Sequence, residues 1–429
     1  MTKPPNLILP HLFNVAVKAA SAELCLEKHI PSPPSGKTFL VGAGKASGAM
    51  AKTFEKFWPY PLEGIIVVPY GHKVECDHVE IIEAAHPIPD QSGQLAAKKL
   101  LNAVNKLDKN DLLVALISGG GSALLPAPPP SLTLQDKQKI INVLLNSGAT
   151  IQEINVVRCY LSVIKGGKLA QAAHPARIST LIISDVSNDD PSVVASGPTI
   201  MPSPNLSKVE TILKKYKIKT SVQVRKFLKR NEKELRFDKT EFEKDTVNIV
   251  AKNSDCLEAA VREARMIGWQ AEILEYSTEG QSHIVASKHA ERILDIAKFR
   301  NSKSPPLVLF SGGETTVNLG NFSGKGGPNS EYLLALGLSL NSDPRIWAIA
   351  CDTDGIDGNS DAAGALLTPY SLLGAEEIGL DPTGLLAAHR SASFFEALGH
   401  NIVTGPTLTN VNDFRAIAIF TGNNPSNNL

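Results

Sequence analysis

Short apolar runs alternate with amphipathic stretches along most of the chain, and glycine-rich turns separate many of them. Across residues 38–68 an apolar run, a glycine turn, an amphipathic stretch and a second apolar run follow one another, the pattern of a βαβ unit. A similar series covers 111–147, and the apolar run at 178–184 follows a helical stretch around 154–173. This alternation predicts a Rossmann-like, doubly wound parallel sheet.

A polar, lysine-rich segment at 202–245 interrupts this alternation, and it predicts solvated helices near a domain boundary. A second series of strands and helices begins with the apolar run at 246–251 and ends with the one at 414–420. We therefore expect an α/β protein of two domains. They are an N-terminal Rossmann-like domain, 1–235, and a C-terminal α/β domain, 245–429.

Length and charge agree with this organisation. A chain of 429 residues exceeds the size at which one hydrophobic core stops growing. The 43 basic residues balance the 43 acidic ones, which argues against nucleic-acid binding and against attachment to an anionic membrane. No apolar stretch is long enough to span a bilayer. We expect a small-molecule partner.

The cysteines and the N-terminus indicate the compartment. The five cysteines are widely spaced and form no zinc-binding pattern, so we expect reduced thiols in the cytoplasm. Residues 6–17 are fairly apolar and precede a small-residue sequence that imitates a signal-peptidase site. Polar residues and Pro10 interrupt the run, which favours an amphipathic first helix over a leader.

The first glycine-rich turn follows the apolar run at 38–43 and opens a predicted helix. Backbone N–H groups there can bind an anion, with Gly42 and Gly44 allowing close approach and Lys45 adding a cation. The turn is not a Walker P-loop, because Phe39 and Ala46 stand where that motif needs a glycine and a hydroxyl residue. It is also a poor dinucleotide fingerprint, since its third glycine is one residue late. The alternative is a tight turn that binds no anion and leaves the Lys45 side chain in solvent.

Two further glycine-rich segments follow apolar runs. Three consecutive glycines rarely serve a structural turn alone, so we expect the first segment to hold a ligand. The second is expected to form a related turn in the C-terminal domain, facing the same cleft. The predicted ligand-binding residues are Ser118, Gly119, Gly120, Gly121 and Ser122 in one, and Gly312, Gly313, Glu314 and Thr315 in the other.

Acidic turns follow two of the predicted strands. Asp185, Asp189 and Asp190 come after the run at 178–184, where open α/β sheets bind ligands, and their carboxylates suit Mg²⁺ or activation of a substrate hydroxyl. The turn at 352–358 lacks the glutamate of an EF-hand and suits either a ligand or a helix cap. Aspartates also form ordinary turns, which stays an alternative.

Two segments pair glycines with lysines. The segments at 165–168 and 324–327 have the composition expected of a clamp for a carboxylate or phosphoryl group.

Taken together, ten motifs in fixed order closely resemble the glycerate 2-kinase family, with its C-terminal MOFRL domain. They are VGAGKASGAMA, AAHPIPD, ISGGGSALLPAP, IKGGKLA, ISDVSNDDPSVVASGPT, SGGETTV, GKGGPNSE, DTDGIDG, DAAGA and TGPTLTNVND. They extend from Val41 to Asp413.

The resemblance implies that the protein uses ATP and Mg²⁺ to phosphorylate D-glycerate to 2-phospho-D-glycerate. It also implies that this reaction takes place in a cleft between the two domains. Lys45 and Lys325 would then stabilise charge on the transferring group, and Asp189 would be the base. The family's GRGGRN motif is GKGGPN in this chain. Lys325 therefore keeps the charge of an arginine without its bidentate fork, and Pro328 replaces a second arginine.

Two other functions compete with this one. Members of the family have also been named hydroxypyruvate reductases, which would use NAD(P)H, although the first turn lacks the features of a dinucleotide site. A non-catalytic sensor of a phosphorylated metabolite would use the same turns without releasing ADP. The oligomeric state stays open, with a homodimer as one alternative.

Overall fold

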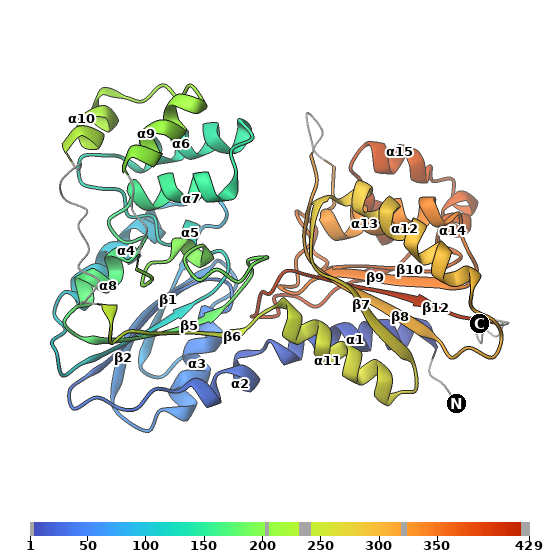
Figure 1. Ribbon diagram of the computed structural model, residues 1–429, viewed down its shortest axis with the longest axis horizontal. Coiled ribbons are helices and arrows are strands. Elements are labelled where there is room, and N and C mark those ends of the chain that lie inside the picture. Colours follow the sequence, from blue (N-terminus) through green and yellow to red (C-terminus); the bar gives the residue numbers. More distant parts are fainter. Residues whose placement is uncertain (1–3, 202–205, 231–241, 319–323, 422–429) are drawn as a thin grey trace. The chain divides into compact units, whose positions relative to one another are not determined.

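The structure is a computed structural model, and it describes residues 4–201, 206–230, 242–318 and 324–421. The chain divides into two compact units, each built on a six-stranded sheet (Figure 1). The N-terminal unit comprises residues 25–250, and the C-terminal unit comprises 1–24 together with 251–429. The domain ranges 1–235 and 245–429 stay a prediction of the sequence.

The sheet of the N-terminal unit has the order β3-β2-β1-β4-β5-β6. β1 pairs in parallel with β2 and β4, β2 with β3, and β4 with β5, which confirms the predicted parallel sheet. The central strands β1 and β4 are buried along almost their whole length, as expected of strands covered on both faces. Their bounds are β1 (Thr38–Ala43), β2 (Leu62–Pro69), β3 (Val79–Ala84), β4 (Leu112–Ile117), β5 (Arg177–Ile183) and β6 (Thr246–Ala251).

The last strand of this sheet differs from the expectation. β6 lies beside β5, where the Thr246 hydroxyl donates a hydrogen bond to Ser179 Oγ at 3.2 Å, although the sequence pattern predicted that the second α/β series begins with this strand. The lysine-rich segment before β6 had suggested the boundary. Part of that segment, 231–241, lies outside the described residues.

Helices surround this sheet, and four of them form a separate cluster. Apolar side chains of α6, α7, α9 and α10 pack on one another, and these helices group together in Figure 1. α6 and α7 each begin with a capping box, as at Thr133, whose Oγ1 accepts the Asp136 N–H at 3.1 Å. The helices are α3 (Ser47–Phe57), α4 (Gln91–Val104), α5 (Gly121–Leu124), α6 (Leu134–Asn146), α7 (Ile151–Tyr160), α8 (Lys168–Ala173), α9 (Leu206–Lys215) and α10 (Val222–Arg230), with 3₁₀ turns at Glu27–His29 and Val194–Ser196.

The C-terminal unit has a mixed sheet in the order β11-β10-β9-β12-β8-β7. β7 and β8 are parallel, whereas β12 runs antiparallel to β8 and β9, and β10 runs antiparallel to β9 and β11. The strands are β7 (Gln270–Gln281), β8 (Leu307–Thr316), β9 (Ile346–Asp352), β10 (Gly364–Leu367), β11 (Asn401–Ile402) and β12 (Asp413–Ile419).

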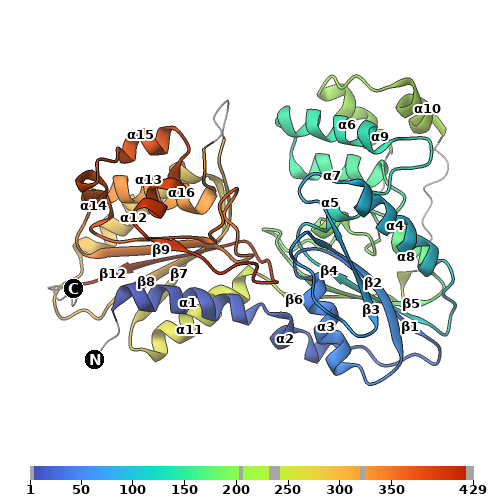
Figure 2. The same cartoon turned by 180° about the vertical axis from the view of Figure 1, so that it is seen from behind.

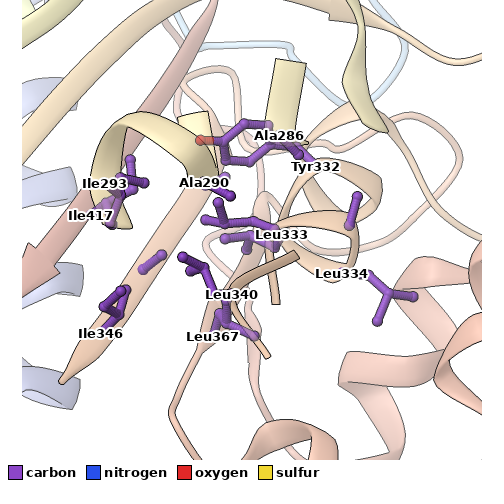
Figure 3. Close-up of a cluster of buried hydrophobic side chains, with 14 of the residues drawn as sticks. Ala286, Ala290, Ile293, Tyr332, Leu333, Leu334, Leu340, Ile346, Leu367 and Ile417 are labelled. Carbon is purple, nitrogen blue, oxygen red and sulfur yellow. The ribbon is translucent and has the colours of Figure 1, made fainter. Parts of the chain in front are cut away.

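Helices cover both faces of the mixed sheet. α1 and α11 lie side by side on one face, and α12, α13 and the short helices after β10 lie on the other (Figures 1 and 2). Tyr332 and Leu333 of α13 pack against Ala290 and Ile293 of α12 in the main apolar core (Figure 3). The helices are α1 (Pro5–Ala19), α11 (Asn253–Met266), α12 (Ser282–Lys298), α13 (Pro328–Leu340), α14 (Ser371–Glu377), α15 (Pro382–Ala387) and α16 (Ser391–Ala397), with α2 (Ala22–Cys25) at the boundary of the units.

Candidate active site

The first two glycine-rich turns interlock at one edge of the parallel sheet. They follow the neighbouring parallel strands β1 and β4, so both lie at the carboxyl ends of these strands. The Lys45 N–H donates to the Gly119 carbonyl at 2.8 Å, and the Ala46 N–H donates to Ser118 Oγ at 3.0 Å. Ser118 is fully buried, and the hydrogen bond that its hydroxyl accepts from Ala46 joins the two turns.

Several glycines are required by this junction. Gly44 has φ of +143°, and a Cβ atom there would lie 2.1 Å from Ser118 Oγ. A Cβ at Gly42 would lie 2.2 Å from the Leu116 carbonyl oxygen, and one at Gly121 would lie 2.5 Å from that of Ala43. These three glycines therefore allow two protein segments to approach each other. This is a structural role, distinct from the predicted approach of backbone to a ligand.

The accessible part of the junction is formed by Lys45, Gly120 and His86. Gly120 has φ of +83°, and a Cβ there would lie 3.1 Å from the His86 ring and 3.5 Å from Lys45 Cγ. Lys45 and Gly120 are half-buried and His86 is exposed. His86 is not among the predicted site residues, although its place in the AAHPIPD motif just after β3 is a signal that could have identified it.

The acidic turn follows β5, the neighbour of β4, and therefore lies at the same edge of the sheet. Asp185, Asp189 and Asp190 are half-buried, and Asp189 has φ of +52°. Asp190 Oδ1 accepts the Ser192 N–H at 2.9 Å, the ordinary turn-forming role of an aspartate. Among the described residues no group of three or more His, Cys, Asp or Glu side chains is arranged to hold a metal ion. Mg²⁺ commonly uses one or two carboxylates and completes its coordination shell with substrate phosphates and water. This turn can supply the carboxylates.

The segment at 165–168 turns its lysines inward. Lys165 Nζ donates to the Ser122 carbonyl at 2.6 Å, and Lys168 Nζ donates to the carbonyls of Cys159, at 2.7 Å, and Ser162. Burial lowers the pKa of Lys168 to about 8 and that of Lys165 well below its usual value. Lys165 therefore binds the second turn itself, whereas Lys168 binds the end of α7 and the loop after it.

The segment at 311–316 is part of a strand, which corrects the expectation of a turn. β8 continues through it and pairs Gly313, Glu314 and Thr315 with β7. Gly312 and Gly313 let other segments of the same chain approach closely, since a Cβ at either glycine would lie within 2.3 Å of Asn253 or Thr278. The glycines had suggested a turn because the pairing with β7 is not visible in the local sequence.

Thr315 belongs to a buried polar network. Its N–H donates to Asp413 Oδ2 at 3.2 Å, and its hydroxyl oxygen accepts from Arg415 at 3.1 Å. Arg415 is fully buried and also bonds Asp413, whose other carboxylate oxygen accepts from Asn329 Nδ2 at 2.6 Å. The network ties β8, β12 and the start of α13 together, whereas Glu314 is exposed.

The segment at 324–327 leads into α13. Lys325 Nζ lies 3.1 Å from a Glu396 carboxylate oxygen and 3.8 Å from Asp361, and hydrogen bonding to Glu396 raises the pKa of Lys325. Pro328 occupies the first turn of α13, where a proline is well tolerated. Asp357 caps this helix, with its two oxygens accepting the N–H groups of Asn329 and Ser330 at 2.9 Å. For Asp357, the capping alternative is therefore the one observed.

Two family profiles match most of the chain. The profile of the family described as "Domain of unknown function (DUF4147)" matches residues 8–229, and that of the MOFRL family matches 307–413. Together with the two six-stranded sheets, these matches define a two-domain α/β protein of the DUF4147 and MOFRL class.

Individual relatives make the assignment specific. A glycerate 2-kinase of Pyrococcus horikoshii is 38% identical over 90% of this chain and 88% of its own length. The crystal structure of a Thermotoga maritima glycerate kinase matches with a TM-score of 0.85 and 30% identity, covering 97% of this chain and 99% of that one. A protein of Agrobacterium vitis that is provisionally named a hydroxypyruvate reductase is 45% identical over 96% of this chain and 94% of its own length. The chain belongs to the glycerate 2-kinase family.

Other expectations concern the compartment. No helix in the described part of the chain is long and apolar enough to cross a membrane. The five cysteines, all within the described residues, form no disulfide bond with one another. A cleft shared by the two units stays a prediction of the sequence.

Proposed function

We propose that the protein transfers the γ-phosphoryl group of ATP to the 2-hydroxyl of D-glycerate and releases ADP and 2-phospho-D-glycerate. The hydroxyl oxygen forms a bond to the γ-phosphorus, the bond from that phosphorus to the β-γ bridging oxygen breaks, and the hydroxyl proton passes to a carboxylate. The glycerate kinase relatives support this choice of acceptor and reaction. A cytoplasmic enzyme with reduced thiols is part of the proposal.

The observation that carries the proposal is the junction of the two glycine-rich turns. It fixes Lys45 and Gly120 beside each other at the carboxyl edge of a parallel sheet, the edge where such sheets bind ligands. Lys45 supplies a positive charge to the phosphates, and Gly120 keeps the surface free of a side chain. Phosphoryl transfer depends mainly on such positioning and charge stabilisation.

The acidic turn after β5 supplies the remaining groups. Asp189 is the candidate base for the acceptor hydroxyl, because it lies at the same sheet edge as Lys45. Asp185 and Asp190 would hold a magnesium ion, since one or two carboxylates completed by phosphate oxygens and water are a usual ligand set. Mg²⁺ would neutralise charge on the β- and γ-phosphates. Lys325 of the C-terminal unit is proposed as a second cation for the transferring group.

One experiment separates this reaction from its rivals. The purified protein is incubated with ATP, Mg²⁺ and either D-glycerate, L-glycerate or lactate, and the products are followed by phosphorus NMR. We expect ADP and 2-phosphoglycerate to form together with D-glycerate only. Direct detection is preferable to a coupled assay, because coupling enzymes that consume NADH would hide a reductase.

The relative named as a hydroxypyruvate reductase makes that activity the second candidate. A parallel reaction contains hydroxypyruvate with NADH or NADPH and no ATP, and its absorbance reports nicotinamide oxidation. Oxidation there without ADP formation in the first experiment would replace the kinase proposal. Ligand binding without either reaction would indicate a sensor.

A further inference from the structure

Four basic side chains gather beneath the helical cluster of the N-terminal unit. Lys137 comes from α6, Arg158 from the last turn of α7, and Lys165 and Lys168 from the loop and helix that follow. Lys137 is 7% exposed and Lys165 is 1% exposed, and the remaining two are half-buried. In the part of the chain that the structure describes, no carboxylate pairs with any of the four.

The lysines differ in what their ammonium groups contact. Lys165 and Lys168 bind backbone carbonyls, among them that of Ser122 and, from Lys168, the carbonyl of Cys159 near the end of α7. Those contacts could be purely structural, because a cation at a helix C-terminus is favourable. Lys137 Nζ is buried and has no hydrogen-bond partner among the described residues. A buried donor without a partner is unfavourable, and it marks a place for a ligand atom.

The electrostatics of the cluster agree with a missing anion. Burial, together with the charges of Lys168 and Arg158, lowers the pKa of Lys137 to about 7. Burial also lowers the pKa of Lys165, where Lys137 and Arg158 add to the effect. Burial raises the pKa of the nearby Cys159 thiol, whereas the charges of Lys165, Lys168 and Lys137 lower it.

The cluster adjoins the candidate active site. Lys165 Nζ donates to the Ser122 carbonyl, and Ser122 Oγ lies 2.9 Å from Ser196 Oγ. Ser122 closes the second glycine-rich turn, whose Gly119 carbonyl accepts the Lys45 N–H. An anion held by the cluster would therefore be next to the turn that is proposed to bind the reactants.

We propose that Lys137, Arg158, Lys165 and Lys168 form an oxyanion-binding site that takes a carboxylate or phosphate group of one of the reactants. Lys137 supplies the donor that has no partner, and the other three surround the bound oxygens with positive charge. The assignment of this anion to a reactant rests on the proposed function. Anion binding itself can be measured without turnover.

The test compares the wild-type chain with Lys137→Met, which keeps an unbranched apolar side chain and removes the ammonium group. Lys139→Met is the matched control, because Lys139 is exposed on the same helix. Binding of inorganic phosphate and of D-glycerate is measured separately by isothermal titration calorimetry at pH 7. Circular dichroism verifies folding, and Lys137→Gln replaces Lys137→Met if that variant does not fold.

We expect the wild-type chain and Lys139→Met to bind at least one of the two anions. Lys137→Met should bind it about tenfold more weakly or worse, the effect of losing one charge-assisted hydrogen bond. A loss confined to phosphate would assign the site to a phosphoryl group, and a loss confined to glycerate would assign it to the acceptor carboxylate. Equal affinities in all three proteins, or no binding of either anion by the wild-type chain, would overturn the proposal. Absence of ADP release would instead count against the proposed function alone.

Discussion

The substitution Gly44→Ala tests the interlocked turns most sharply on the structural side. Gly44 has φ of +143°, a conformation that L-residues adopt only with strain of about 1–3 kcal/mol. Its new Cβ would also lie 2.1 Å from Ser118 Oγ and 2.5 Å from the Ser118 carbonyl oxygen, so one turn must move. Overpacking of this kind costs about 1–3 kcal/mol. We therefore expect the N-terminal unit to lose about 2–6 kcal/mol of unfolding free energy.

Gly71→Ala is the matched control, because Gly71 belongs to the same unit, has φ of +80° and has no atom within 4 Å of an added Cβ. Strain alone should cost it about 1–2 kcal/mol. Hydrogen exchange measured at increasing urea concentrations reports both the unfolding free energy of β1 and β4 and the protection of the Lys45 and Ala46 amides. Both amides should exchange much faster in Gly44→Ala only. Equal stability and equal protection in the two variants would refute the interlocked arrangement.

Three further predictions concern the C-terminal unit. Asp413→Ala leaves the fully buried Arg415 without its carboxylate and should cost about 3–5 kcal/mol in urea unfolding, and a loss below about 1 kcal/mol would contradict the network. Burial raises the pKa of Asp357 from 3.8 to about 6, so the folded state binds more protons than the unfolded state between these values, and this contribution to stability falls as pH rises through them. The difference of about 2 in pKa corresponds to about 3 kcal/mol, and Asp357→Asn should flatten the pH dependence of unfolding between pH 4 and 6, whereas an unchanged slope would exclude the assignment. Lys325→Met should leave the urea midpoint of unfolding unchanged, because the ion pair between Lys325 and Glu396 is exposed. The same substitution should lower turnover about tenfold, and unchanged turnover would show that Lys325 does not belong to the active site.

The parallel sheet could be predicted because its strands are short, mainly apolar runs followed by glycine-rich or acidic turns. β1, β4 and β5 all have this form, and the turns after them carry Lys45, Gly120 and Asp189. The pattern of apolar and polar residues could not predict which strands pair when they are far apart in the sequence. The glycines at 312 and 313 indicated a turn, yet β8 continues through both of them and pairs with β7 at Gly313.

Side-chain partners far apart in sequence were equally invisible. Lys325 pairs with Glu396, 71 residues away, so its sequence context could not show that it is already in an ion pair. Lys137 is a different case, because a signal was present. It precedes Ile140, Ile141 and Leu144 at helical spacing, which places a lysine on the buried face of α6.

The central claim is that the Lys45 turn serves phosphoryl transfer, and turnover of Lys45→Ala tests it most directly. ADP and 2-phosphoglycerate are measured with saturating ATP, Mg²⁺ and D-glycerate for the wild-type chain, for Lys45→Ala and for Lys52→Ala, whose lysine is exposed on α3. Loss of a transition-state donor lowers turnover by about a hundredfold or more. We predict that loss for Lys45→Ala and wild-type turnover for Lys52→Ala. Near-normal turnover in Lys45→Ala would contradict the account.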